Sequence, residues 1–390
     1  LLAVNVNSGT NYNGSYFEQT ANIDLSSYWW TPIGSSSSIY FAGNYDGGGY
    51  TVSGLFTESG SYRGLFGYTY GTMTSVSPNG LYIRNIGITD SNIQGSQYTG
   101  AVIGYAIYTS VSNCYNTGTI VGGSYTGGIV GYAASYATIS SCYNTGNVSG
   151  TSNVGGIAGY SAMTLSTSYN KGNISGSSYV GGIVGAKAAG NVTNTYNTGS
   201  VSGTANGVGG IVGYISSSSS ISYSYNTGRV GISMMYATSG CYVGGILGYD
   251  NYGATISNCV NLGSVSYYAT GGYQVRYAGQ IAGYLRYRVS NCYYAGLGST
   301  YGVIASGGAT NSNCSSITAE EFKDESFLST SSNWNSSGWD VSSVWGITQF
   351  ANEGYPYLLG VGNIAPDNTD LFWTDSAVTT RDTDFEGSGT

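Results

Sequence analysis

Residues 124–150 read SYTGGIVGYAASYATISSCYNTGNVSG, and most of the chain repeats this pattern. Two phrases within it recur in step. The first, YTGGIVGY here, starts again at Tyr98, Asn153, Tyr179, Gly207 and Tyr242, with a weaker copy at Tyr277 and a shortened one at Tyr62. The second, CYNTG at Cys142, starts again at Cys114, Ser168, Thr195, Ser224, Cys259 and Cys292. Two phrases that recur together at a nearly constant spacing are typical of proteins in which repeated units stack into an array.

The residues within one unit predict strands joined by turns. Apolar or alternating residues at 128–130, at 137–143 and around Val148 predict three short strands per unit. One unit per coil gives an all-β fold, a parallel β-solenoid of about eight to nine coils that rise about 4.8 Å each. Glycine pairs such as Gly127–Gly128 and the Asn-Thr-Gly turns are expected to supply left-handed backbone.

In such a solenoid, equivalent residues of successive units stack into ladders. One inward ladder is expected at Ile129, Ile157, Ile183, Ile211 and Ile246, and another at Val148, Ile174, Val201 and Val230. A tyrosine ladder is expected at Tyr105, Tyr132, Tyr160, Tyr214, Tyr249 and Tyr284. The chain then divides into an N-terminal strand segment and cap (1–60), the repeats (61–305), a C-terminal cap (306–360) and an acidic tail (361–390).

The phrases GGIVGY and CYNTG at this period resemble the GLUG repeat of bacterial surface proteins. IDLSSYWWTPIG at 23–34 and FAGNYDGGGYTVSGL at 41–55 are similar to the lead-in of such arrays, and IRNIGI at 83–88 is similar to a first coil. WDVSSVWGI at 339–347 and EGYPYLL at 353–359 are similar to their closing cap, so the resemblance covers about residues 16–360. It implies a secreted bacterial β-solenoid, extracellular or at the cell surface. Some relatives carry a metallopeptidase that cleaves immunoglobulin A, but that enzyme needs HExxH, and this chain has no histidine.

The distribution of charge argues against catalysis. Charged residues make up 7% of the chain, and between residues 91 and 319 the only carboxylate is Asp250. Solenoids that cleave polysaccharides need clustered carboxylates, and a Ser, Cys or Lys nucleophile needs a base. Asp24 and Asp46 fit turn carboxylates that accept hydrogen bonds from backbone amides, and Thr318 with Glu321 fits a capping box. We therefore expect no enzyme activity, no catalytic residue, no metal site and no cofactor.

Composition also excludes two classes of partner. The net charge is −8 and the ten cationic residues are scattered, which argues against nucleic acid. No run of about 18 apolar residues occurs, so no membrane insertion is expected.

Four cysteines share one position of the repeat, in the pairs Cys114 with Cys142 and Cys259 with Cys292. Adjacent coils would place each pair about 4.8 Å apart, close enough for a disulfide in principle. Because Ser or Thr occupies the same position elsewhere, stacked buried thiols are the favoured alternative. In the sequence, Cys241 and Cys314 do not occupy this position of the repeat, and neither has a clear partner.

The C-terminal tail is acidic yet contains apolar residues. Residues 320–390 carry a net charge of −10, against +5 for residues 91–319. Leu371, Phe372, Trp373 and Phe385 predict that the tail docks on a surface, in its own molecule or in a neighbour. One candidate surface is a basic, tyrosine-rich face around Arg276, Arg286 and Arg288, and another is an open strand edge.

Together these features predict a non-enzymatic structural protein that assembles head to tail into an extracellular fibre or surface layer. Its main partner would be itself, as a homopolymer. The alternative is a monomeric cell-surface adhesin module that binds glycan or protein through a tyrosine-rich face.

Overall fold

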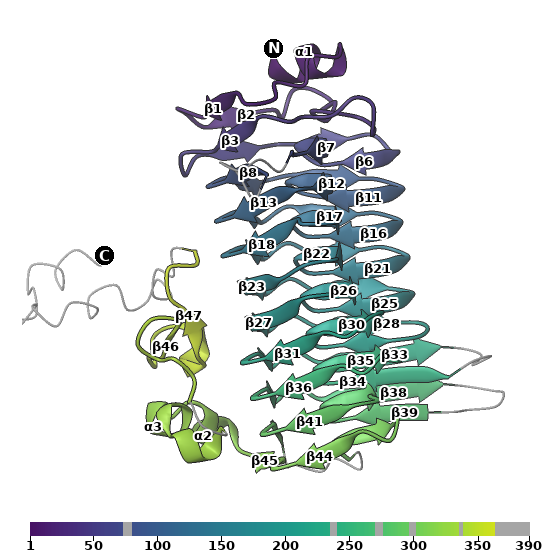
Figure 1. Ribbon diagram of the computed structural model, residues 1–390, viewed down its shortest axis with the longest axis vertical. Coiled ribbons are helices and arrows are strands. Elements are labelled where there is room, and N and C mark those ends of the chain that lie inside the picture. The colour runs from purple at the N-terminus through teal and green to yellow at the C-terminus, as the bar shows by residue number, and fades with distance from the viewer. Residues whose placement is uncertain (73–79, 235–239, 270–275, 296–301, 335–337, 363–390) are drawn as a thin grey trace, which may run out of the picture.

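The computed structural model describes residues 1–72, 80–234, 240–269, 276–295, 302–334 and 338–362, and its main body is a parallel β-solenoid (Figure 1). Strands stack in parallel register from β1 near the N-terminus to β45 near the last coil. The predicted fold, a parallel β-solenoid of about 8–9 coils, is confirmed.

Among the described residues, the solenoid contains one large sheet and three smaller ones. The large sheet contains β1 (Tyr16–Glu18), β2 (Ile23–Asp24), β3 (Asn44–Asp46), β4 (Thr51–Ser53), β8 (Leu81–Arg84), β9 (Gly87–Thr89), β13 (Thr109–Ser112), β14 (Tyr115–Asn116), β18 (Thr138–Ser140), β19 (Tyr143–Asn144), β23 (Leu165–Asn170), β27 (Asn191–Asn197), β31 (Ser220–Ser222), β32 (Tyr225–Asn226), β36 (Thr255–Ser257), β37 (Val260–Asn261), β41 (Arg288–Ser290), β42 (Tyr293–Ala295), β44 (Thr310–Ser312) and β45 (Ser315–Ile317).

The three smaller sheets complete each coil. The second contains β5 (Phe56–Thr57), β10 (Asn92–Gln94), β15 (Thr119–Val121), β20 (Val148–Ser149), β24 (Ile174–Gly176), β28 (Val201–Gly203), β33 (Val230–Met234) and β38 (Val265–Ala269). The third contains β6 (Ser61–Arg63), β11 (Gln97–Gly100), β16 (Ser124–Gly127), β21 (Ser152–Gly155), β25 (Ser178–Gly181), β29 (Val208–Gly209), β34 (Cys241–Gly244) and β39 (Arg276–Gly279). The fourth contains β7 (Phe66–Tyr70), β12 (Ile103–Ile107), β17 (Val130–Ala133), β22 (Ala158–Ser161), β26 (Val184–Lys187), β30 (Val212–Ile215), β35 (Leu247–Asp250), β40 (Ala282–Tyr284) and β43 (Ile304–Ser306).

Most coils hold five short strands rather than the predicted three, because left-handed residues divide the predicted runs. Ser141, with φ of 53°, separates β18 from β19 within the run 137–143. Tyr125, with φ of 61°, bends the chain within β16. The prediction that the glycine pairs and the Asn-Thr-Gly turns supply the left-handed backbone is therefore wrong for these positions. In most units the left-handed residue is instead the Tyr or Asn that opens the first phrase and the residue just before the second.

The glycine pairs are required for space. A Cβ at Gly128 would overlap the carbonyl oxygen of Gly156 and the side chain of Asn144. Gly156 stands in the same relation to Asn170. The first phrase therefore packs directly on the asparagine of the second, and this explains why the two phrases keep step along the sequence.

The interior consists of stacked apolar ladders and a long ladder of asparagines. The predicted isoleucine and valine ladders are buried as expected. The asparagine ladder consists of fully buried residues: Asn116, Asn144, Asn170, Asn197, Asn226 and Asn261. Each of the first five donates from Nδ2 to Oδ1 of the next, at 2.7–2.9 Å, and to a backbone carbonyl two residues later. This chain of hydrogen bonds fixes the register between coils.

The N-terminal end is covered by a short helix, α1 (Leu2–Asn7), and not by the strand that we predicted there. Leu2, Ala3 and Val6 pack against the solenoid core, and Val6 is buried. A helix places these three positions on one face, whereas a strand would point Ala3 away from Leu2 and Val6. Burial of this face over the open end of the core therefore overrides the alternating pattern of the sequence.

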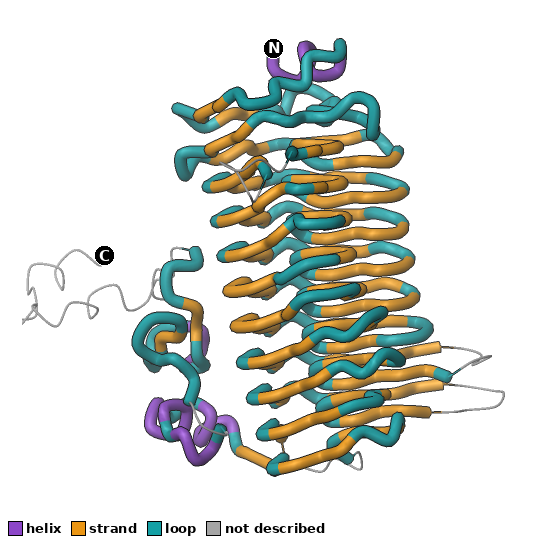
Figure 2. The backbone as a smooth tube through the Cα atoms, in the orientation of Figure 1, coloured by secondary structure: helices purple, strands orange, loops and turns teal. Residues whose placement is uncertain are grey.

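At the other end, the repeats extend past the predicted boundary at residue 305. β44 and β45 pair with β41 and β42 and complete a last coil that ends at Ile317. The chain then turns back along the side of the large sheet through α2 (Ala319–Phe322), α3 (Glu325–Ser329), η1 (Ser331–Asn333), β46 (Trp345–Gly346), η2 (Asn352–Gly354) and β47 (Tyr357–Leu358). Figure 2 shows this segment beside the strands, so the described part of the cap covers a flank and not the end of the last coil.

Candidate functional site

The large sheet carries an outward row of tyrosines, which we call the cap-side ladder: Tyr115, Tyr143, Tyr169, Tyr196, Tyr225 and, after Val260, Tyr293. From Tyr115 to Tyr225 the rings stack with centroids 4.7–5.0 Å apart and interplanar angles of 2–7°. Parallel stacking covers the ring faces with neighbouring rings, so the ladder presents mainly ring edges outward.

The C-terminal cap binds the middle of this ladder through aromatic side chains. Phe322 meets Tyr225 edge to face, with centroids 5.2 Å apart, and Trp345 lies tilted against Tyr196 and Tyr225. The Tyr225 hydroxyl accepts a hydrogen bond from Asn352 Nδ2 at 2.6 Å and donates to the carbonyl of Pro356. Burial raises the pKa of Tyr225 well above its usual value.

Beyond the cap, the ladder continues into a groove of about 600 Å³. The groove is lined by Glu18, Asp46, Gly48, Gly49, Asn85, Asn113, Tyr115, Ser141, Tyr143, Gly360 and Gly362. Tyr115 and Tyr143 are half-buried there, whereas Tyr196 and Tyr225 beneath the cap are fully buried. The groove is therefore the place where the cap covers ring edges of the cap-side ladder only in part.

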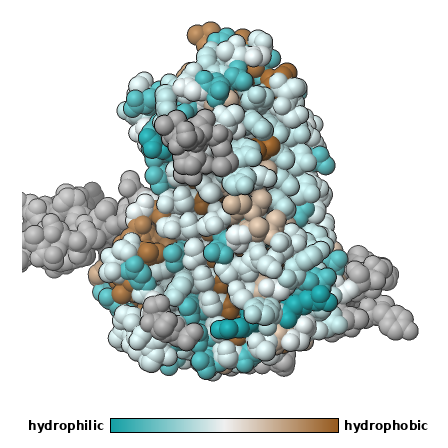
Figure 3. Space-filling model, in the orientation of Figure 1, coloured by the Kyte–Doolittle hydropathy of each residue, from teal (hydrophilic) through white to brown (hydrophobic). Residues whose placement is uncertain are grey.

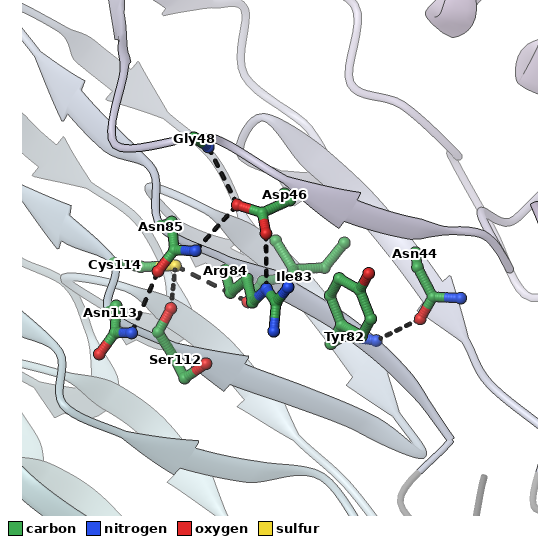
Figure 4. Close-up of polar contacts among 10 residues, drawn as sticks. All are labelled: Asn44, Asp46, Gly48, Tyr82, Ile83, Arg84, Asn85, Ser112, Asn113 and Cys114. Atoms are coloured by element: carbon green, nitrogen blue, oxygen red, sulfur yellow. Dashed lines mark hydrogen bonds and ion pairs between the residues drawn. The ribbon is translucent and has the colours of Figure 1, made fainter. Parts of the chain in front are cut away.

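Asp46 is fixed by the hydrogen bonds drawn in Figure 4. Its Oδ1 accepts from the backbone N–H of Gly48 at 3.0 Å and from Asn85 Nδ2 at 2.8 Å, and its Oδ2 accepts from Arg84 Nε at 2.7 Å. Burial acts to raise the pKa of Asp46, but these hydrogen bonds and the Arg84 charge outweigh it and hold the pKa below its usual range. Asp46 is thus a turn carboxylate, as predicted, and is not poised as a general acid.

Two side chains extend this network along the groove. Asn113 Nδ2 donates to Asn85 Oδ1 at 3.0 Å, which continues the polar floor into the next coil. Glu18 is the register partner of Asp46 and is exposed. Among the described residues, no group of three His, Cys, Asp or Glu side chains could hold a metal ion.

The two buried charges of the array organise loops. Asp250, the single carboxylate between residues 91 and 319, accepts from the backbone N–H groups of Tyr252, Gly253, Ala254 and Arg286. Lys187 Nζ donates to the carbonyls of Met163, Ala189 and Ser161. Burial lowers the pKa of Lys187 to about 7. The two side chains lie in one column of the fourth sheet, with Ile215 between them.

The predicted assembly contacts are placed as follows. Arg276 is in β39 of the third sheet, and Arg288 is in β41 of the large sheet. Arg286 lies between β40 and β41, where its side chain donates to the carbonyl of Asn251. Leu371, Phe372, Trp373 and Phe385 lie outside the described residues.

The cysteines of the repeat stack within the core. Cys114, Cys142, Cys259 and Cys292 are buried free thiols in this structure. Burial raises the pKa of Cys114 and of Cys292 well above the usual value, which makes these thiols poor nucleophiles. Cys314 continues the Cys259–Cys292 column, because β45 continues the register of β42. The shared Asn-Cys dipeptide at Asn291 and Asn313 is the signal that could have shown this.

The residues that the sequence reasoning missed are the tyrosines of the second phrase. We used only the tyrosine that ends the first phrase to predict a ladder, and that ladder is present. Tyr115, Tyr143, Tyr169, Tyr196 and Tyr225 hold the cap and line the groove, and they repeat at an equally regular spacing. Which of the two ladders the cap covers depends on tertiary packing, which the repeat pattern does not contain.

Comparison with known proteins identifies the repeat. The GLUG motif model matches residues 95–121 and 122–149, so the chain contains GLUG motif repeats. No curated protein matches the chain. Among solved structures, the chain is similar to a candidate immunoglobulin A1 protease from Bacteroides ovatus, with 21% identity and a TM-score of 0.49 over 92% of this chain and 89% of that one. No helix in the described ranges is both long and apolar enough to span a membrane.

Proposed function

We propose that this protein is a non-enzymatic, extracellular structural protein that associates with copies of itself through the two ends of its solenoid. The observation that carries the proposal is that the N-terminal end exposes large apolar side chains around α1, while the described strands of the last coil each pair on one side only. Contacts between two different ends do not close on themselves in a rod, so repeated association builds a filament.

The N-terminal end exposes apolar side chains. Six of the 13 exposed large hydrophobic residues in the described ranges lie within the first 29 positions: Leu1, Val4, Tyr16, Ile23, Tyr28 and Trp29. Trp29 is 69% exposed and Tyr28 is 73% exposed. Figure 3 shows apolar residues at this end, while the flank in view is largely of neutral hydropathy. Clustered exposed apolar residues typically mark an interaction surface.

The C-terminal end exposes strand edges. Among the described strands, β43, β44 and β45 each pair on one side only, with β40, β41 and β42 respectively. Val303 and Ile304 are half-buried there, whereas Ile281 and Ala282 one coil earlier are fully buried. An open edge of this kind accepts a further strand or a second coil.

The alternative, an adhesin that binds glycan on a tyrosine platform, gains less support from the geometry. The rings of the ladder that ends the first phrase also stack face to face, for example Tyr105 on Tyr132 at 4.8 Å and 4°. A sugar stacks on a ring face, so it would find free faces chiefly where the tyrosine columns are interrupted, as at Asn153, Ala186 and Gly207.

Filament formation tests the proposal. We expect the purified protein to form filaments in negative-stain electron microscopy at high concentration, with an axial repeat close to the length of one solenoid. Trp29→Lys places a charge on the N-terminal end without disturbing the core and should abolish them. Val121→Lys changes an exposed position on a flank strand and serves as the matched control. Single rods at every concentration, or filaments that tolerate Trp29→Lys but not Val121→Lys, would contradict association through the ends.

A further inference from the structure

We propose that the groove beside Tyr115 and Tyr143 is the binding site for the chain's own C-terminal tail, with Phe372 and Trp373 packed against the exposed ring edges. This contact is a latch within one molecule. It is independent of association through the ends and goes beyond it.

The cap shows how this ladder is recognised. Every aromatic contact that the cap makes with it is tilted or edge to face: Phe322 and Trp345 on Tyr225, and Phe327 and Trp334 on Tyr293. Such pairs are favourable beyond the area that they bury. Tyr115 and Tyr143 belong to the same ladder and present the same edges, but in the described residues no tryptophan or phenylalanine ring lies against them.

The path of the chain selects the occupant. The described chain ends at Gly362, which touches the ladder: a Cβ there would lie 2.9 Å from the Tyr169 hydroxyl and 3.0 Å from the Tyr143 ring. Gly360 and Gly362 themselves line the groove. Phe372 is ten residues further on, within a reach of about 35 Å, so the tail begins beside the site and easily spans it.

The chemistry of the groove favours an aromatic segment over a sugar or a charged ligand. The faces of Tyr143 are covered by Tyr115 and Tyr169, and a Cβ at Gly87 would overlap the Tyr115 ring, so neither tyrosine offers a face for a sugar. Asp46 is neutralised by Arg84, and Glu18 adds one exposed carboxylate. Leu371, Phe372 and Trp373 are uncharged, and the tail has few other large apolar side chains. Asp370 and Asp375 flank these three residues, so the proposal places only the apolar side chains in the groove.

Crosslinking in the full-length chain tests the latch. In a Cys314→Ser background the other native cysteines are buried, so a thiol at Thr374→Cys and one at Ser141→Cys in the groove can be joined by a short bis-maleimide. Asn313→Cys is the matched control, because it occupies the same corner of the coil, is exposed, and lies six coils away, about 29 Å along the axis.

We expect the Ser141 pair to crosslink about tenfold faster than the Asn313 pair, because docking raises the effective concentration of one thiol at the other. The product should be monomeric, and Phe372→Ser with Trp373→Ser should lower the rate of the Ser141 pair, because only the proximity that the tether provides then remains. Equal rates for the two pairs, or a rate that survives loss of both aromatic residues, would overturn the proposal. A dimeric product would overturn a latch within one molecule and assign the groove to a neighbour's tail. If Trp29→Lys abolished filaments but left crosslinking of the Ser141 pair unchanged, association through the ends and docking of the tail would be shown to be independent.

Discussion

The asparagine ladder gives the sharpest test of how the coils are held together. Asn170 is fully buried, donates at 2.7 Å to the carbonyl of Gly172 and at 2.7 Å to Asn197 Oδ1, and accepts at 2.7 Å from Asn144 Nδ2. Asn170→Ala removes all three hydrogen bonds and leaves the acceptors on Gly172 and Asn197 without this donor. At about 1 kcal/mol for each bond, and more for a buried group left unpaired, the free energy of unfolding should fall by about 3–5 kcal/mol.

Asn173→Ala is the control, because this asparagine lies three residues away in the same turn and is exposed. Its Oδ1 accepts from the backbone N–H and the hydroxyl of Ser200, and solvent can replace both bonds. Its loss should cost less than about 1 kcal/mol. The two variants should therefore separate clearly in urea unfolding followed by far-ultraviolet circular dichroism. Equal midpoints would refute the view that the buried ladder, rather than apolar stacking alone, holds the coils in register.

Three further predictions follow from buried polar groups. The Tyr196 hydroxyl is buried and has no hydrogen-bond partner among the described residues, so Tyr196→Phe should be neutral or stabilising in urea unfolding. Tyr225→Phe should cost about 1–2 kcal/mol, because it removes the bonds of this hydroxyl to the cap; the reverse order would contradict this assignment. Burial raises the pKa of Tyr45 and of Tyr143 to about 12, so their contribution to the free energy of unfolding should be intact below pH 10 and lost as the pH rises to 12. Unfolding and the tyrosinate absorbance at 295 nm should then increase together. Ionisation well before unfolding would count against burial of these tyrosines. Burial lowers the pKa of Lys187 to about 7, so between pH 7 and 10 this amine is protonated in the unfolded state but not in the folded state. The free energy of unfolding of the unsubstituted protein should therefore rise by about 1.4 kcal/mol for each pH unit in this range. Lys187→Met should remove this slope in unfolding midpoints measured at each pH.

The solenoid could be predicted from the sequence because its period is written into every unit. Residues such as Ile129 and Val148 recur at fixed offsets, and stacking of equivalents follows directly. The backbone conformation within a unit was harder to predict. Tyr125 and Ser141 adopt left-handed backbone although such residues rarely do, because the neighbouring coils fix the path. Tyr125 lies in β16, which pairs with β11 and β21 on its two sides, and the Ser141 N–H donates to the carbonyl of Ser166 in the next coil at 3.3 Å. A prediction from the conformational preferences of single residues assigned the left-handed positions to glycine instead.

The groove could not be predicted because it depends on where a non-repeating segment packs. The capping box of Thr318 and Glu321 was predicted and is present: the Thr318 hydroxyl accepts from the backbone N–H of Glu321, and the Glu321 carboxylate accepts from the backbone N–H of Thr318. Nothing in that local motif indicates that Trp339 and Trp345 then lie against the large sheet. The apolar residues of the cap need a partner surface, but either tyrosine ladder would have satisfied a pattern-based argument.

The side-on position of the cap bears directly on association. A cap over the last coil would pair the free edges of β43, β44 and β45, and the rod would end there. Instead the cap uses its aromatic residues on the flank, and the last coil limits its exposure of apolar surface through polar side chains: Asn311 stands where Val289 is buried one coil earlier. Such an end resists nonspecific hydrophobic contact but still offers backbone hydrogen bonds. A partner that satisfies them must bring a strand in parallel register, and a repeat protein of this kind carries such strands on every copy. Arg288 is the only charged residue in β41, β42, β44 and β45, the strands that the last two coils contribute to the large sheet. Association through this end should therefore depend little on salt and strongly on urea.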